Sequence, residues 1–266
     1  MGAKFTSADD RVTEDDFKAV LDVLGGKSPW QGNIQPNIDK GLKNSAKHPF
    51  QIVDSKIYAQ RMAAVGETGD FNSTPGVTDK KQGLISMLES FGVNSRAARF
   101  GHALHETVHL VSDPPGKAPN GHSSALAQLG SGLLEGLVEA VTEDILTMQG
   151  LKLARADLRG HVARVPVARA LIKDVGVPLL GGLLFGGNFH DFLMTVNGMY
   201  SAAGWMQIKN LTTADHRDSA IAKMKELSAA QAAQNKIGGN QPARPALSTP
   251  APICADTSRA CRSRAP

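Results

Sequence analysis

The chain has 266 residues, which suits one domain of about 200 residues with extensions, or two small domains. Hydrophobic residues make up 41% of it and charged residues 20%, as is ordinary for a soluble globular protein. Five basic residues and one acidic residue follow from Ser228 onward, which leaves 24 basic and 24 acidic side chains in the first 227 residues. A body without net charge lacks the basic footprint of a nucleic-acid-binding domain, so we expect no nucleic-acid partner.

The cysteines and the apolar segments indicate where the protein is made. Both cysteines, Cys254 and Cys261, lie near the C-terminus, so the rest of the chain needs no disulfide and suits the reducing cytoplasm. The first residues contain no apolar signal-peptide segment, so we expect the protein to be cytoplasmic when made; export without a cleavable signal peptide stays open. The longest apolar stretch, 175–189, is short and rich in glycine, which predicts no membrane insertion.

The first part of the chain predicts a small β element between helices. Thr13 is a good N-cap, and Phe17, Val20 and Leu21 share one face of the helix that follows. The expected elements are a helix over 13–24, a long loop over 27–49, a strand or strand pair over 50–62, turns over 67–79 and a helix over 80–92. We interpret residues 1–49 as an N-terminal helix and loop extension.

The second part of the chain predicts helices almost throughout. The expected elements are a helix over 96–112 that ends at two prolines, a helix over 123–149, two helices over 162–176 and 189–208 around a glycine-rich stretch, and a last helix over 213–234. Residues 50–227 therefore form the predicted domain, which is mainly α (α+β). Residues 228–266 are interpreted as the end of the last helix and a basic Pro/Ala-rich tail, which we expect to be disordered because it buries too little apolar surface to fold.

The pentapeptide His105-Glu106-Thr107-Val108-His109 is an HExxH motif on a predicted helix. Residues four apart lie one turn along the same helix face, so both imidazoles can reach one metal ion. Glu106 lies about 100° around the helix from His105, where it can approach a metal-activated water without being a ligand. Two histidines, a carboxylate and an open position are the ligand set of a catalytic zinc site. The motif therefore predicts metal-assisted hydrolysis with Glu106 as the general base.

The third metal ligand would define the class of peptidase. A metzincin would need glycine at position 112 and histidine at position 115, and Ser112 and Pro115 exclude that class. A gluzincin takes a glutamate from a following helix. In the apolar segment 133–144 the glutamates recur every four residues, at Glu135, Glu139 and Glu143. A stripe of this kind is also what a solvated helix face would present.

Periodicity does not choose between Glu135 and Glu139, which point to the same side of their helix. Gly136 favours Glu135, because a residue without a side chain would let the HExxH helix approach closely at that level.

The segment HALHETVHLVS followed by LLEGLVEAVTEDI resembles the HExxH and downstream E-G-hydrophobic-x-E pattern of small gluzincin-like metallopeptidases. This group includes peptidase domains that bacterial secretion and contractile injection systems deliver as toxins. The later segment LIKDVGVPLLGGLLFGGNFHDFLMTVN is similar to their C-terminal helical hairpin, which closes over the site. The resemblance covers roughly residues 50–208 and implies a zincin-like helical domain with a small β element before the HExxH helix.

The resemblance also implies a role for each motif residue. His105 and His109 would be metal ligands, Glu106 the general base, Glu135 the third ligand and Glu139 a carboxylate that orients a ligand histidine. One zinc ion would bind per chain. The threonine that usually follows the E-G-hydrophobic stretch is replaced by Val138, so a hydrogen bond made by that threonine would be absent.

The group that stabilises the oxyanion is less well marked. His190 and Tyr200 are candidates, because such sites use a histidine, tyrosine or arginine donor for this purpose. Ordinary packing within the helical hairpin is the alternative for each of them.

These observations predict zinc-dependent hydrolysis of a peptide or protein substrate, in a protein that a secretion apparatus could carry out of the cell as an effector. One alternative is a catalytically degenerate helical binding module, stabilised by zinc or metal-free. A second is a structural component of a secretion system. The intact Glu106 argues against degeneracy, because a structural metal site does not need it.

Overall fold

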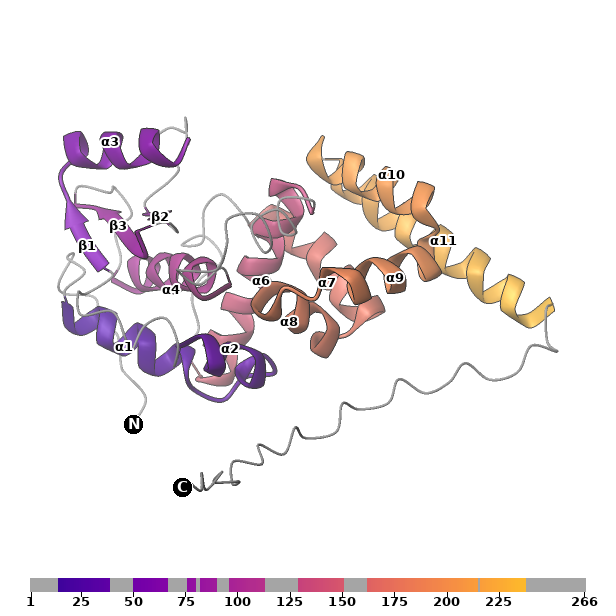
Figure 1. Cartoon of the computed structure of the whole chain (residues 1–266), viewed down its shortest axis with the longest axis horizontal. Coiled ribbons are helices and arrows are strands. Elements are labelled where there is room, and N and C mark those ends of the chain that lie inside the picture. Colours follow the sequence, from indigo (N-terminus) through magenta and orange to yellow (C-terminus); the bar gives the residue numbers. More distant parts are fainter. Residues whose placement is uncertain are drawn as a thin grey trace, which may run out of the picture.

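The computed structural model describes residues 14–38, 50–66, 76–79, 82–89, 96–112, 129–150, 162–214 and 216–237. These residues form ten α-helices, one short 3-10 helix and a three-stranded sheet (Figure 1). The expected fold class, mainly α with a small β element before the HExxH helix, is therefore confirmed. The proposed tail beyond residue 237 lies outside the described residues.

The bounds of the elements are α1 Glu14–Leu24, α2 Gln31–Asn37, β1 Phe50–Val53, α3 Ser55–Val65, β2 Gly76–Asp79, β3 Leu84–Leu88, α4 Arg96–Ser112, α6 Ser131–Met148, η3 Val162–Arg164, α7 Val165–Val175, α8 Val177–Gly186, α9 Phe189–Tyr200, α10 Ala202–Thr213 and α11 Arg217–Ile237. From η3 onward the described elements follow one another with short connections.

The sheet has the strand order β1-β3-β2, with β1 parallel and β2 antiparallel to the central strand β3. Helix α3 covers one face of the sheet and α4 the other (Figure 1). Alternate residues therefore enter different clusters: Val77 packs toward α3, while Ile85 and Met87 belong to the large core that contains α4. The same alternation places Gly76 and Thr78 of β2 on the α4 side of the sheet.

Several predicted elements are wrong in the β region. The helix expected over 80–92 is the strand β3, whose five residues are all buried and so give no alternating pattern. The turns expected over 67–79 include the strand β2 at 76–79, and residues 67–75 lie outside the described residues. The segment 50–62 contains one strand, followed at Ser55 by the helix α3, which the side chain of Asp54 caps by accepting from the Ile57 amide.

Further differences concern the glycine-rich and proline-containing segments. The loop expected over 27–49 contains helix α2, and the glycine-rich stretch after 176 is helix α8. These two helices pack together, and a Cβ atom on Gly181 of α8 would lie only 2.3 Å from Oδ1 of Asn33 of α2. The single helix expected over 189–208 is divided into α9 and α10 by Ser201, whose φ of 62° interrupts the helical path.

The N-terminal helices belong to the main core rather than to a separate extension. Trp30 and Ile34 are fully buried in the same cluster as Leu104 of α4 and Leu137 of α6. The side chain of Asn37 donates to two main-chain carbonyls, that of Val111 at 2.8 Å and that of Phe185 at 2.6 Å. Residues 14–38 therefore fix the ends of α4 and α8 relative to each other.

A polar cluster anchors α6, the helix that carries the candidate third ligand. Asp144 accepts a hydrogen bond from Nε1 of Trp30 at 2.8 Å and from Arg169 of α7 at 2.6 Å. Arg169 also pairs with Glu143 at 3.1 Å, and the two carboxylates together raise the pKa of Arg169 against the opposing effect of burial. Glu143 therefore faces α7 and does not share a role with Glu135 and Glu139.

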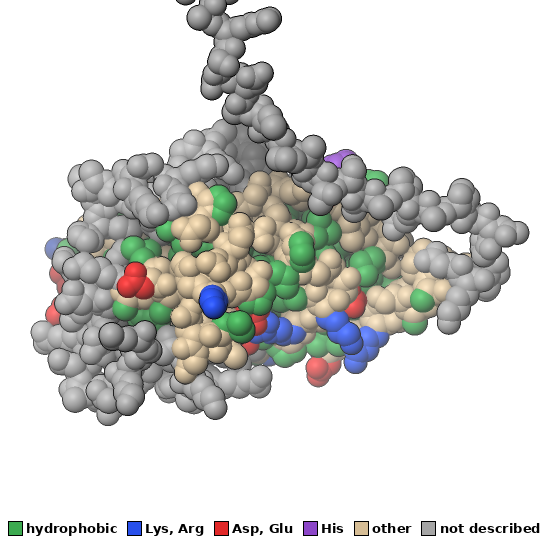
Figure 2. Space-filling model, turned by 90° about the horizontal axis from the view of Figure 1, so that it is seen from below, with side chains coloured by type: hydrophobic (Ala, Val, Ile, Leu, Met, Phe, Trp, Pro, Cys, Tyr) green, Lys and Arg blue, Asp and Glu red, His purple; other side chains and the backbone are tan. Residues whose placement is uncertain are grey.

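Among the described residues, no helix is both long and apolar enough to cross a membrane. On the face drawn in Figure 2, the described part of the surface carries basic and acidic side chains interspersed with hydrophobic ones.

Candidate metal centre

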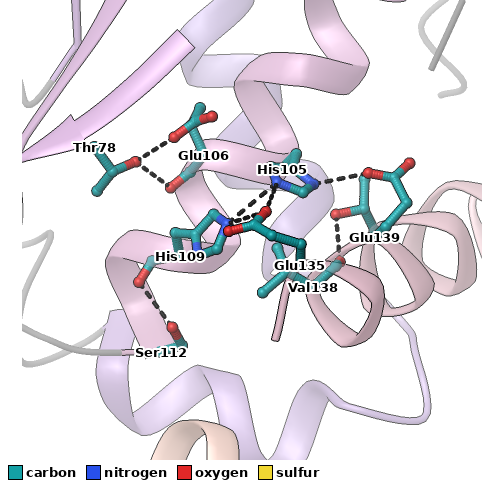
Figure 3. Close-up of polar contacts among 9 residues, drawn as sticks. Thr78, His105, Glu106, His109, Ser112, Glu135, Val138 and Glu139 are labelled. Atoms are coloured by element: carbon teal, nitrogen blue, oxygen red, sulfur yellow. Dashed lines mark hydrogen bonds and ion pairs between the residues drawn. The ribbon is translucent and has the colours of Figure 1, made fainter. Parts of the chain in front are cut away.

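The centre lies between α4 and α6, which pack against each other in the core. Both histidines come from successive turns of α4 and are almost fully buried, at 4% exposure for His105 and 8% for His109. The apolar neighbours Leu104 and Val108 fix this helix in the core, so the motif's spacing turns both rings toward α6. Glu135 and Glu139 reach toward them from one face of α6 (Figure 3).

Three ligand-type atoms converge on one point. Oε2 of Glu135 lies 3.2 Å from Nε2 of His105 and 3.1 Å from Nε2 of His109, and the two Nε2 atoms are 3.2 Å apart. A tetrahedral ion with bonds of about 2.0–2.1 Å has ligand atoms about 3.3–3.4 Å apart, so this nearly equilateral triangle fits such an ion closely. The buried group of His105, His109 and Glu135 could hold a metal ion.

Glu139 takes a different position from Glu135. Its Oε2 lies 2.8 Å from Nδ1 of His105, on the side of the ring opposite to Nε2 (Figure 3). A carboxylate at that atom favours the tautomer with the proton on Nδ1, which leaves the Nε2 lone pair directed at the metal position. The two glutamates that periodicity left open are thus separated by geometry, with Glu135 at the convergence point and Glu139 behind His105.

The ionisation of the metal-free group follows from its burial and its charges. Burial alone would lower the pKa of His105, but the hydrogen bonds and charges of Glu135 and Glu139 raise that pKa well above its ordinary value. For Glu135, burial would raise the pKa, and the neighbouring His109 together with hydrogen bonds from both histidines lowers it well below the ordinary value. The centre therefore stabilises a negative carboxylate that can serve as an oxygen ligand.

Glu106 lies beside this group without joining it. Its side chain turns toward the sheet, where the Thr78 hydroxyl is 2.6 Å from Oε2 and 3.1 Å from the main-chain oxygen of Glu106 (Figure 3). Sequence reasoning missed Thr78, because residues 67–79 were interpreted as turns and nothing in the sequence links position 78 to the motif 28 residues later. The alternation of Gly76 and Thr78 on one strand face is the only local signal, and it is meaningful only once the strand is recognised.

The role predicted for Gly136 is wrong, although the glutamate before it occupies the predicted position. A Cβ atom on Gly136 would lie 2.8 Å from the main-chain oxygen of Arg164, in the short helix η3. The missing side chain therefore makes room for η3 and not for the HExxH helix. Glu135 lies about 100° around α6 from Gly136, so its side chain can reach the histidines while Gly136 contacts η3.

The Tyr200 hydroxyl is engaged with another side chain, and its proposed part in stabilising the oxyanion stays a prediction. The hydroxyl donates to Asp174 at 2.6 Å, and the tyrosine ring stacks on Trp205.

His190 is exposed in the first turn of α9. No contact between His190 and the three-residue group occurs among the described residues, so its proposed part in catalysis stays a prediction.

Comparison with known proteins identifies no relative: no protein-family model, no curated protein and no solved structure matches the chain. The geometry of the centre and the resemblance of its motifs are therefore what supports a function for this chain.

Proposed function

We propose that the protein is a zinc-dependent metallopeptidase of the gluzincin type. The observation that carries this proposal is the convergence of His105, His109 and Glu135 to within 3.1–3.2 Å of one another, with a second glutamate, Glu106, beside them on α4. A structural metal site has no use for that additional carboxylate, whereas a hydrolytic site requires a general base.

The chemistry of the ligand set favours zinc. Two imidazole nitrogens and one carboxylate oxygen are the ligands of several catalytic zinc sites, whereas structural zinc sites use four protein ligands. The group contributes three ligand residues from the described part of the chain, so a position remains for water or substrate. Zinc, when bound, would supply the Lewis acidity that activates a water and polarises the scissile carbonyl.

The protein side chains would have separate roles in the reaction. Glu106 would accept the proton of the attacking water and then transfer it to the nitrogen of the leaving amine. Glu139 would hold the His105 ring by its Nδ1–H, so that Nε2 stays directed at the metal. The burial of both histidines would exclude competing water from the ligand atoms. Delivery of the protein as a secreted effector is supported by the resemblance of the motifs alone.

The test begins with metal analysis of the purified protein, for which we expect one equivalent of zinc. The zinc-loaded protein is then incubated with a mixed pool of peptides, and new termini are identified by mass spectrometry. Glu106→Gln should keep the zinc and lose hydrolysis by a factor of about 10² to 10⁴, because the general base is removed and the ligands are intact.

Two other results would point elsewhere. Stoichiometric zinc without hydrolysis in the unaltered protein would favour the degenerate binding module. A protein that takes up no zinc at all would exclude the metallopeptidase.

A further inference from the structure

The side chain of Glu106 rests against the strand β2 and not against the metal ligands (Figure 3). We propose that Gly76 and Thr78 of β2 form a seat for the Glu106 carboxylate, and that Thr78 is a positioning residue for the general base. The assignment of a catalytic purpose to this seat depends on the proposed metallopeptidase function.

The hydroxyl of Thr78 has two acceptors within reach. Its Oγ1 lies 2.6 Å from Oε2 of Glu106 and 3.1 Å from the main-chain oxygen of the same residue. While the carboxylate is ionised, the hydroxyl donates its hydrogen to Oε2, which is a short hydrogen bond to a charged acceptor. This bond restricts the side-chain torsions of a glutamate that would otherwise sample several rotamers.

The same hydroxyl can also serve the protonated form of Glu106. The proton from water would arrive on Oε1, which is not bonded to Thr78. Oε2 would then be the carbonyl oxygen of the carboxylic acid and would still accept from the Thr78 hydroxyl. Thr78 gains and loses no proton in this exchange, so it can hold the base before and after the transfer.

Gly76 supplies the space that the carboxylate needs. A Cβ atom at this position would lie 2.7 Å from Cγ and 3.3 Å from Cδ of Glu106, and 2.8 Å from Sδ of Met87. Residues 76 and 78 point to the same face of β2, because side chains alternate along a strand. Gly76 leaves room for the methylene chain of Glu106, and Thr78 binds its carboxylate.

The backbone of the seat is fixed by the sheet. β2 pairs with the buried central strand β3, with Gly76 opposite Met87 and Thr78 opposite Ile85. The sheet and α4 share the large core cluster through Ile85 and Met87. A base placed by two rigid elements is held more precisely than one whose position depends on its own helix alone.

Three variants distinguish the effects of the Thr78 hydroxyl and of the space at Gly76 from general effects on packing. Thr78→Val has the same shape without the hydroxyl, and Thr78→Ser keeps the hydroxyl without the methyl group. Gly76→Ala adds one methyl group against Glu106. Thr213→Val is the matched control, because Thr213 is exposed and its hydroxyl donates to a carbonyl of its own helix.

In the zinc-loaded protein, we expect Thr78→Val to lower kcat by about 10- to 100-fold with KM nearly unchanged, because the base is misplaced and substrate contacts are intact. Thr78→Ser should recover most of this loss, Gly76→Ala should lower kcat, and Thr213→Val should behave like the unaltered protein. All variants should retain one equivalent of zinc. An unchanged kcat in Thr78→Val, or an equal loss in Thr78→Ser, would overturn the positioning role.

A measurement that does not depend on hydrolysis tests the contact between Thr78 and Glu106 itself. In the metal-free protein, Thr78→Val should lower the urea midpoint of unfolding when Glu106 is present and leave it nearly unchanged in a Glu106→Ala background. Equal shifts in both backgrounds would show that Thr78 and Glu106 are not coupled and would overturn the seat. A coupled pair in a protein without peptidase activity would uphold the seat and reject the proposed function, so the two failures are distinguishable.

Discussion

At the scale of single residues, the centre depends on two glutamates that lie one helical turn apart and do different things. Glu135 meets the Nε2 atoms of both histidines, while Glu139 contacts Nδ1 of His105. Glu135→Ala should therefore abolish tight zinc binding, as should His105→Ala and His109→Ala. Glu139→Ala should weaken zinc binding by about 10- to 100-fold, because the histidine loses its orienting partner and remains a ligand.

Zinc affinity of each variant is measured by competition with a chelator of known affinity. Glu143→Ala is the control, since Glu143 belongs to the same acidic stripe and pairs with Arg169 instead. Loss of metal in Glu139→Ala combined with its retention in Glu135→Ala would reverse the two roles.

The contact of Tyr200 predicts how the stability of the protein changes at alkaline pH. Burial and the adjacent Asp174 raise the pKa of Tyr200 well above its ordinary value of about 10. Because this pKa is raised in the folded state, the contribution of the Tyr200 hydroxyl to the free energy of unfolding is fully present below a pH of about 10. That contribution is lost as the pH rises further. Tyr200→Phe should lower the free energy of unfolding by about 1.5–3 kcal/mol at pH 7, the range for a hydrogen bond to a charged group.

The difference in unfolding free energy between the two proteins should shrink above pH of about 10. Urea titrations at pH 7 and at two alkaline values measure it, and comparison with the variant cancels the effect of titrating lysines. Equal stability at pH 7 would show that the contact with Asp174 contributes nothing.

At the scale of elements, the position of α6 depends on the cluster around Asp144. Asp144→Ala leaves the indole N–H of the fully buried Trp30 without its acceptor, which costs about 1–3 kcal/mol. Asp144→Asn keeps a carbonyl oxygen for Trp30 and should recover part of the loss, although it removes the pair with Arg169. Urea denaturation measures both variants, and an Asp144→Ala protein as stable as the unaltered one would contradict this account.

Local sequence pattern is sufficient to predict some of the elements and not others. The helix of the HExxH motif and the helix of Glu135 were predictable, because each has a continuous apolar face and is long. β3 was not, since a central strand buried on both faces has the composition of a buried helix. The stretch expected to be glycine-rich after residue 176 contains helix α8, whose Gly181 lies against the Asn33 side chain of α2, a contact that sequence pattern cannot reveal.

The same limit applies to the centre. Turn spacing along α4 brings His105 and His109 to one helix face, so these two residues could be proposed from the sequence. Turn spacing along α6 leaves Glu135 and Glu139 equal, and only their contacts with His105 in the fold separate them. Thr78 meets Glu106 only because β2 packs on α4, and Tyr200 meets Asp174, 26 residues earlier in the chain, only through the tertiary fold. Both facts depend on tertiary packing.

At the scale of the whole molecule, the two ends of the described chain should respond differently to truncation. Removing residues 1–38 exposes the pocket that Trp30 and Ile34 fill, and each large apolar side chain lost from a core costs about 2–5 kcal/mol. We expect this protein to lose its cooperative thermal transition. A chain that ends at Ile237 lacks only the Pro/Ala-rich segment, and its melting temperature should be nearly unchanged.

Scanning calorimetry of both truncated proteins tests this contrast. A cooperative transition after removal of residues 1–38 would restore the interpretation of this region as an extension. A large fall in melting temperature on removal of the C-terminal segment would show that it packs on the body.

One contact of the Asn37 side chain can form only late in synthesis. One of its two acceptors, the carbonyl of Phe185, follows 148 residues later in the chain. At a translation rate of about 5–20 residues per second, this acceptor is made roughly 7–30 s after Asn37. For that interval Trp30 and Ile34 have no complete core to enter, so the nascent chain is exposed to aggregation. Slower elongation should therefore lower the soluble yield, and a chaperone that holds the N-terminal helices should restore it.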